Sequence, residues 1–156
     1  MEDISIVEVK PQLVAGITRK GSYLLIPELL LKVYSYLDAN GIAPAGMPAF
    51  ICHETSPEAV MEANERGTAE VEVVWPVAAG MKESGEIKVY ELPGGKMARA
   101  VHKGPYETSE STYLELFAWL EENKLSISGP IREIYPNDPS TVKPEEILTE
   151  ILVPVS

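Results

Sequence analysis

The sequence predicts an α+β fold with a mainly antiparallel sheet, and two observations support this. The first is an internal repeat, because Lys20-Gly21-Ser22-Tyr23 returns 83 residues later as Lys103-Gly104-Pro105-Tyr106. The second is the order of elements, since each half reads as two strands, one helix and two further strands. Hairpins with only one long helix in each half are typical of α+β proteins. Two repeats, unlike a longer array, predict a pseudo-twofold domain.

The same offset of 83 residues holds over much of the chain. Identical residues recur at Ile4 and Ile87, Glu8 and Glu91, Ala15 and Ala98, Leu37 and Leu120, Asn40 and Asn123, Gly46 and Gly129, and Ile51 and Ile134. Aromatic residues recur as well, at Tyr34 and Phe117 and at Tyr36 and Trp119. We therefore expect one domain over residues 1–156, made of two repeats at about 1–78 and 85–156. The segment between them is short, which places both halves in one sheet.

The first half begins with two strands and a helix. Residues 4–9 and 13–18 contain β-forming residues and are separated by Pro11, which predicts two strands followed by a turn at residues 20–22. From Ile26 the apolar residues recur at steps of three and four, which predicts a helix. Pro27 fits its first turn and Asn40-Gly41 its end.

The remaining elements follow from the same signals. Residues 50–53 read as a short strand and 57–65 as one or two helical turns. In residues 70–77, valines and Trp75 alternate with Glu70 and Glu72, which predicts a strand buried on one side. The second half is expected to have strands at 86–92, 96–102, 131–135 and 149–155, with a helix at about 106–122. Pro93-Gly94-Gly95 is the expected turn between the first two of these strands.

Composition and charge exclude several classes of function. The 156-residue chain carries a net charge of −11, and its lysines and arginines are scattered, which argues against nucleic acid and anionic membranes as partners. Such a charge is compatible with cationic ligands, although it also describes an ordinary acidic surface. No apolar run approaches the about 20 residues that span a bilayer, and Met1-Glu2-Asp3 starts no signal peptide, so we expect a cytoplasmic protein.

Glu133 is the strongest candidate for a functional residue, because the repeat symmetry breaks there. Strand alternation places it on the same side as Ile131 and Tyr135, while Arg132 points to the opposite face. Its mate in the first half is Phe50. A carboxylate on an apolar face needs a partner, a proton or a ligand, since its burial alone costs several kcal/mol. The alternative is that the strand lies at an edge and Glu133 meets water or a nearby basic residue.

Aromatic residues could form the walls of a cavity around Glu133, between the two halves. The candidates are Tyr23, Phe50, Trp75, Tyr90, Tyr106 and Tyr135. Aromatic faces attract cations by about 0.5–2 kcal/mol each, although any one of these residues could equally belong to the core. Tyr23 and Tyr106 are favoured, because both follow the repeated turn where helix and sheet diverge.

Histidine and cysteine give little support for a metal site or a nucleophile. His53 and His102 lack the spacing of metal ligands, and His102 is expected at the turn or near the surface. His53 and Glu54 are adjacent, so their side chains point to opposite faces of a strand. Cys52 is the only cysteine and reads as a small core residue without a neighbouring base. We expect no cofactor, since no glycine-rich phosphate loop precedes a helix.

Several segments in this order resemble the GyrI-like small-molecule-binding domain, which is also the effector-binding domain of multidrug-sensing bacterial transcription activators. The resemblance lies in the repeated Arg/His-Lys-Gly-x-Tyr turn, the helix end at Asn40 followed by Gly46, the segment Ile134-Tyr135-Pro136-Asn137-Asp138-Pro139, and the closing Thr149 to Val155. It covers essentially the whole chain. It implies a duplicated strand-helix-strand-strand (SHS2) module, a curved antiparallel sheet with two main helices on one face, and a ligand cleft between the halves.

The resemblance also implies an acidic residue in the cleft that faces cationic aromatic drugs and dyes, and by position this residue is Glu133. Some members of the family hydrolyse cyclopropane-bearing toxins with a cleft glutamate, and others resemble gyrase inhibitors. Three hypotheses follow. The first is a binding domain that captures flat, apolar, often cationic molecules. The second is a hydrolase in which Glu133 is the catalytic base, and the third is an interaction module with a protein partner such as gyrase.

Overall fold

The computed structural model describes residues 4–78, 82–138 and 140–156, and its strands form one eight-stranded antiparallel sheet in the order β1-β6-β8-β7-β3-β4-β2-β5. The strands are β1 (Ser5–Val9), β2 (Gln12–Gly21), β3 (Ala49–Cys52), β4 (Ala69–Pro76), β5 (Lys88–Leu92), β6 (Gly95–Lys103), β7 (Ile131–Ile134) and β8 (Leu148–Pro154). The helices are α1 (Ile26–Ala39), α2 (Pro57–Arg66) and α3 (Glu110–Glu122), with 3₁₀ turns η1 (Tyr23–Leu25), η2 (Tyr106–Thr108) and η3 (Pro144–Glu146). The predicted α+β class with an antiparallel sheet is thus confirmed.

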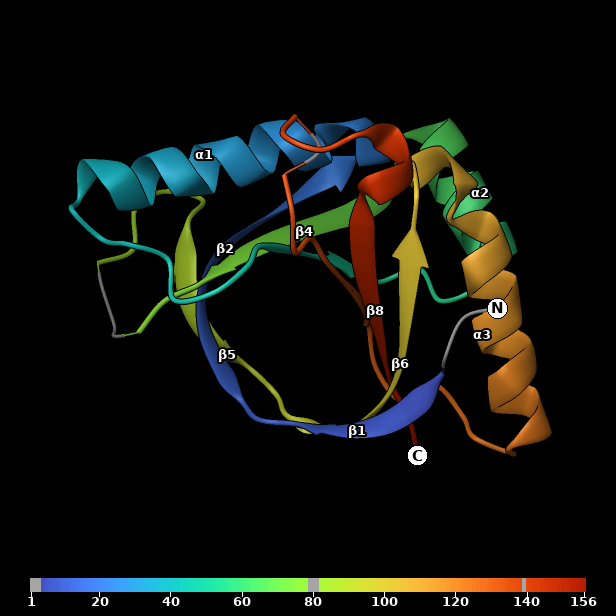
Figure 1. Ribbon diagram of the computed structural model, residues 1–156. Helices are drawn as coiled ribbons and strands as arrows, with labels where there is room; N and C mark the ends of the chain where they lie inside the picture. The colour runs from blue at the N-terminus through green and yellow to red at the C-terminus, as the bar shows by residue number, and fades with distance from the viewer. Residues whose placement is uncertain (1–3, 79–81, 139) are drawn as a thin grey trace.

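The sheet is curled into an open half-barrel, and α1 and α3 lie on its outer side (Figure 1). The predicted hairpins are wrong at both ends of this sheet. β1 pairs with β6 of the second half, and β5 pairs with β2 of the first half, so neither β1–β2 nor β5–β6 is a hairpin. The β1–β2 loop and the β5–β6 loop cross in close contact at Gly94. A Cβ at this position would lie 2.3 Å from the carbonyl oxygen of Val9, so the crossing leaves no room for a side chain. Each half therefore completes the sheet of the other.

The 83-residue repeat is visible in the local structure. The side-chain amides of Asn40 and Asn123 end α1 and α3 in the same way, donating to the carbonyls of Tyr36 and Trp119 at 2.8 Å each. At the centre of the sheet, Phe50 on β3 pairs directly with Glu133 on β7. Glu133 is also the residue that the repeat assigns to Phe50. The pseudo-twofold axis therefore passes beside this pair, and β7 is a central strand rather than the edge strand considered above.

A single apolar core joins the helices to the outer face of the sheet. The α1 positions Leu29, Val33 and Leu37 are fully buried there, as the three- and four-residue spacing predicted. From α3, Leu116 and Leu120 pack into the same core. Pro27 lies within the first two positions of α1, where its missing N–H costs no hydrogen bond. Both helices are thus fixed against the sheet by burial of one face.

The opposite face of the sheet is also buried, which corrects the prediction for β4. Glu72 is only 8% exposed, although alternation placed it in solvent. Its carboxylate accepts a hydrogen bond from Tyr90 Oη at 2.5 Å and lies 2.7 Å from His53 Nε2. The curl of the sheet encloses this face, so a polar residue there finds partners from other strands instead of water. Arg132 lies on the same face and donates to the carbonyl of Pro93, away from Glu133 as predicted.

β2 continues through Gly21, which pairs with Ala69, so the turn expected at residues 20–22 is shorter. The segment that joins the two repeats contains residues 79–81, which lie outside the described residues. Among the described residues, no helix has both the length and the apolar character needed to cross a membrane.

Candidate functional site

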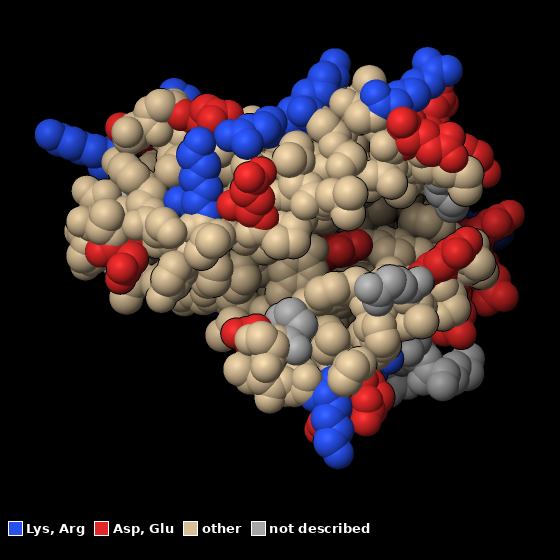
Figure 2. All heavy atoms as spheres, turned by 90° about the horizontal axis from the view of Figure 1, so that it is seen from above, with Lys and Arg blue, Asp and Glu red and all other residues tan. Residues whose placement is uncertain are grey.

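A cleft with two lobes opens on the outer face of the sheet between the two halves. The lobe beside α3, called here the α3 lobe, has a volume of about 450 Å³, and the lobe beside the start of α1, the α1 lobe, about 730 Å³. Both lobes share Tyr23, Ile26, Tyr106 and Glu133, which form the waist between them. Seen from above, the molecule is hollowed here, and acidic atoms lie inside the hollow among uncharged ones (Figure 2). The cleft thus lies across the pseudo-twofold axis.

Glu133 is held at this waist by two tyrosine hydroxyls. Tyr113 from α3 donates to one carboxylate oxygen, and Tyr135 donates to the other at 3.1 Å. The carboxyl group is partly buried in the wall of the cleft, and this burial raises its pKa. The two tyrosine hydrogen bonds oppose the shift, as does His102 when its ring is protonated. Among the described residues, Glu133 forms no ion pair with Lys or Arg. The site therefore holds an acidic group whose fixed partners are all neutral hydroxyls.

The tyrosines around Glu133 stay protonated donors. Burial raises the pKa of Tyr113 and of Tyr135 well above the usual value, and the nearby charge of Glu133 adds to each shift. Tyr135 packs edge-on against Tyr106, with ring centroids 5.6 Å apart and planes at 67°. On the other side of the axis, Tyr23 packs edge-on against Phe50 at 5.7 Å. Aromatic edges and faces therefore line the waist from both halves.

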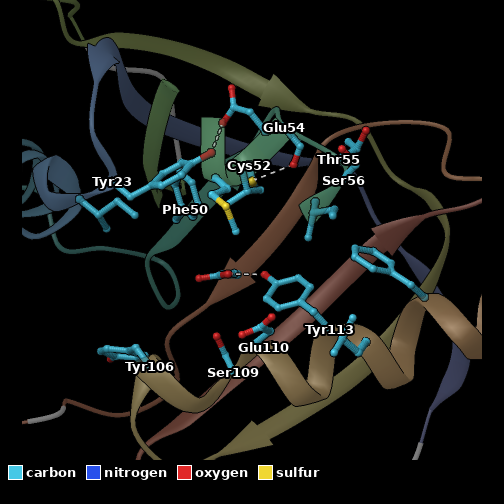
Figure 3. Close-up of a pocket in the computed structure, with 17 residues that line it drawn as sticks. Tyr23, Phe50, Cys52, Glu54, Thr55, Ser56, Tyr106, Ser109, Glu110 and Tyr113 are labelled. Carbon is cyan, nitrogen blue, oxygen red and sulfur yellow. Dashed lines mark hydrogen bonds between the residues drawn. The ribbon is translucent and has the colours of Figure 1, made fainter. Parts of the chain in front are cut away.

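The α3 lobe carries most of the polar side chains of the cleft. In Figure 3, Cys52 and Glu54 come from the end of β3 and face Ser109, Glu110 and Tyr113 across the lobe. Cys52 is buried and donates its thiol to the carbonyl of Glu54 at 3.1 Å. Burial, helped by the charge of Glu133, raises the pKa of this thiol to about 12. A thiol with such a pKa is a poor nucleophile at neutral pH, so Cys52 is a wall residue.

The α1 lobe is mainly apolar. Its walls include Trp75 from β4 and Leu30 from α1, and the Trp75 indole N–H donates to the carbonyl of Leu30 at 3.0 Å. Tyr34 packs against the outer side of the Trp75 ring, with centroids 5.2 Å apart. Met47 stands at the rim and is 53% exposed. The rigid indole of Trp75 and the flexible thioether side chain of Met47 together could pack against flat ligands of different shapes.

All six residues proposed from the sequence line the cleft: Glu133, Tyr135, Tyr106, Tyr23, Trp75 and Phe50. Tyr90, the seventh candidate considered, lies on the opposite face of the sheet with Glu72. Of the two positions expected for His102, the one near the surface is wrong, because the residue is only 4% exposed. Its ring lies at the turn, with Nε2 3.0 Å from the carbonyl oxygen of Pro105 and Nδ1 2.8 Å from Thr112 Oγ1 in α3. In the described part of the chain, no group of three His, Cys, Asp or Glu residues could hold a metal ion.

Among the cleft residues that the sequence did not predict, Tyr113 and Glu54 are two that the repeat could have found. Tyr113 falls at the three- and four-residue spacing of apolar positions in α3 together with Leu116, Phe117 and Leu120, which predicts a core residue. Its repeat mate, however, is Leu30, so a phenol stands where the other half has an aliphatic group. Glu54 has Asn137 as its mate, which is a change from amide to carboxylate. Both changes are breaks in symmetry of the kind that singled out Glu133. Glu133 could be recognised because it lies on a strand, where successive side chains point to alternate faces. Helix and loop positions have no such alternation to show which face a side chain points to.

The chain matches the family model described as the GyrI-like small molecule binding domain over residues 2–156, and it belongs to this family. Among curated proteins, no sequence matches it significantly. Its fold is similar to the EcmrR C-terminal domain, with 20% identity, coverage of 100% of this chain and 98% of that chain, and a TM-score of 0.87. In the EcmrR–DNA complex, the similar region at 19% identity covers 99% of this chain but only 57% of EcmrR, with a TM-score of 0.86.

Two further solved structures share the fold over nearly their full lengths. A hydrolase from Listeria innocua has 15% identity and a TM-score of 0.71, with 98% of this chain and 91% of that chain covered. The protein SAV2435 bound to tetraphenylphosphonium has 14% identity and a TM-score of 0.61, with 99% and 94% covered. The fold is therefore found both in a protein described as a hydrolase and in one bound to an aromatic cation.

Proposed function

We propose that this domain captures flat or bulky aromatic cations in the two-lobed cleft, with the positive charge at Glu133. The observation that carries the proposal is the position of this carboxyl group. It is held between Tyr113 and Tyr135 at the waist of the cleft, and no basic side chain of the described residues pairs with it. A buried carboxyl in such a place costs folding free energy, which a cationic ligand would offset.

The walls of the cleft fit the same ligand class. The aromatic side chains of Tyr23, Tyr106 and Trp75 line it from both halves, and each aromatic face attracts a desolvated cation by about 0.5–2 kcal/mol. The net charge of −11 favours the approach of cations at low salt. The similar fold of SAV2435, which is bound to tetraphenylphosphonium, supports the choice of an aromatic cation as the first probe.

The test is a calorimetric titration with tetraphenylphosphonium, paired with a titration followed by tryptophan fluorescence, since Trp75 lines the α1 lobe. We expect binding to the wild type and a loss of about tenfold or more in affinity in Glu133→Gln, because the buried countercharge is removed. Glu122→Gln is the matched control, since this exposed residue at the end of α3 removes the same charge outside the cleft. Equal affinity in the wild type and in Glu133→Gln would refute the proposed role of the charge.

A hydrolase is the second candidate, and one observation favours it. Burial raises the pKa of Glu133, and a carboxyl with a raised pKa beside hydroxyl donors is suited to general acid–base work. In this alternative Glu133 takes a proton from water as the water oxygen bonds to a ring carbon of a cyclopropane conjugated to a carbonyl. The ring C–C bond breaks, its electrons move to the carbonyl oxygen, and that oxygen receives the proton back from Glu133. Tyr106, which lines the waist, would donate a hydrogen bond to this oxygen. Incubation with a cyclopropane-bearing alkylating agent distinguishes the two. Multiple turnovers that disappear in Glu133→Gln support the hydrolase, whereas stoichiometric capture without product supports the binding domain.

A further inference from the structure

The two lobes of the cleft are symmetry mates of each other. At the 83-residue offset, Leu30 of the α1 lobe corresponds to Tyr113 of the α3 lobe, and Tyr135 corresponds to Cys52. Tyr23 and Tyr106 are mates that both line the waist. Glu133 lies beside the axis and lines both lobes. A perfectly symmetric cleft would bind a molecule equally well in either orientation. Each difference between the two lobes therefore favours one orientation of a bound molecule over the other.

The differences in the first turns of the two helices place polar groups in the α3 lobe. Tyr113 stands where the α1 lobe has Leu30, and Glu110 at the mouth stands where it has Pro27. Ser109 replaces Ile26 in the same way, although Ile26 itself also reaches the waist. The one acidic residue particular to the α1 lobe is Asp138. Its carboxylate accepts hydrogen bonds from the N–H and hydroxyl of Ser140, at 2.8 and 2.7 Å, and so serves its own turn.

Glu54 is the difference that the fold does not explain. Its Oε2 accepts the backbone N–H of Glu70 at 3.2 Å, just inside β4. In the second half, Asn137 does the same with a neutral amide oxygen, which accepts the N–H of Leu148 at 3.1 Å at the start of β8. The turn therefore needs an acceptor but no charge. The negative charge of Glu54 remains available for another purpose.

Glu54 lies in the wall of the α3 lobe. Tyr23, a residue of the waist, donates its hydroxyl to Oε1 of Glu54, which ties the carboxylate to the wall of the α3 lobe (Figure 3). No Lys or Arg among the described residues forms an ion pair with it. Each carboxylate oxygen can accept a further hydrogen bond. Besides Glu110 at its mouth, the α3 lobe thus holds Glu54 on the wall opposite Tyr113, an acidic group separate from Glu133.

We infer that the preferred ligand is an elongated aryl-alkyl diamine that crosses the waist, with its aromatic end in the α1 lobe and a terminal ammonium in the α3 lobe. Its inner ammonium lies against Glu133, and the terminal one donates to Glu54. The inference rests on the proposed function, because it assumes that Glu133 receives a cation. It adds an orientation and a second charge, which a ligand such as tetraphenylphosphonium does not have.

The test compares two probes that differ only at one end, naphthylmethyl-butylamine and N-(naphthylmethyl)butane-1,4-diamine. Calorimetry measures the dissociation constant of each with the wild type and with Glu54→Gln. In this variant the amide oxygen can keep the hydrogen bond from Glu70 N–H, and the amide NH₂ can donate to the Tyr23 hydroxyl oxygen. We expect the diamine to bind about tenfold more tightly than the monoamine to the wild type, as one charge-assisted hydrogen bond predicts. In Glu54→Gln the ratio falls close to one, while the affinity for the monoamine stays unchanged.

Two controls separate this inference from the proposed function and from loss of structure. Glu65→Gln removes an exposed charge from α2 outside the cleft and should keep the wild-type ratio. Glu54→Asn copies the residue of the second half and replaces Glu54→Gln if that variant does not fold. Equal binding of both probes to the wild type, or an unchanged ratio in the Glu54 variants, overturns the inference. If neither probe binds, the inference also falls, and tetraphenylphosphonium then decides whether the proposed function falls with it.

Discussion

Glu133→Gln should stabilise the folded protein at neutral pH and leave its stability nearly unchanged in acid. Burial raises the pKa of the Glu133 carboxyl in the folded state, so the folded protein binds a proton that the unfolded chain releases. In the wild type, the stability that this group contributes is fully present below its ordinary pKa. It is lost as the pH rises through the raised folded value. Gln carries no such proton, so its contribution stays constant with pH.

The magnitude follows from the size of the pKa elevation. Each unit by which the folded pKa exceeds the unfolded one costs the wild type about 1.4 kcal/mol of unfolding free energy at pH values above both. The groups around the carboxyl limit this cost, since Tyr113 and Tyr135 donate hydrogen bonds to it. The neighbouring Cys52 stays a neutral thiol, because its own pKa is raised to about 12. A rise of a single unit would already be measurable.

Urea denaturation of the wild type and of Glu133→Gln, at a series of pH values from 4 to 8, measures the effect. The difference between the two free energies should be small at about pH 4 and should grow in favour of the variant above it, by about 1.4 kcal/mol for each unit of elevation. Glu122→Gln, with its exposed side chain, serves as the control and should show no such growth. A constant difference across this range, or a variant that becomes relatively weaker with rising pH, would refute the assignment of a raised pKa to Glu133.

Three smaller changes test other parts of the structure. Tyr113→Phe removes a hydroxyl donor from Glu133, so in the same denaturation series the pH-dependent loss of stability should move to higher pH. Gly16→Ala would place a Cβ 2.4 Å from Tyr90 Oη and should cost about 1–3 kcal/mol in thermal unfolding, whereas a neutral result would show that the inner face is loosely packed. Ser56→Ala removes the N-cap of α2 and should cost about 1 kcal/mol by the same measurement.

Most of the fold could be predicted because its elements depend on local patterns. The spacing of Leu29, Val33 and Leu37 requires a helix with one buried face, and the structure has α1 there. Matching half to half then gave the symmetry and, through Phe50 and Glu133, the residue beside the axis. That single comparison also predicted where a cleft between the halves would be centred.

What the sequence did not reveal depends on contacts between distant segments. The exchange of β1 and β5 between halves leaves no local signal, because a strand has the same pattern whichever neighbour it pairs with. The burial of Glu72 follows from the curl of the sheet, which closes a face that alternation alone places in solvent. Tyr113 looks like one more apolar residue of α3 until the position of Glu133 opposite it is known.

The most direct test of the central claim is a crystal structure of the protein soaked with methyltriphenylphosphonium. The claim is that Glu133, at the waist between the lobes, receives the positive charge of the ligand. We predict that the phosphonium centre lies beside the Glu133 carboxylate, with phenyl rings packed against Tyr106 and Trp75 at the distances typical of cation–π and aromatic contacts, within about 6 Å. A ligand bound elsewhere on the surface, or one in the cleft with its charge directed away from Glu133, would contradict the claim.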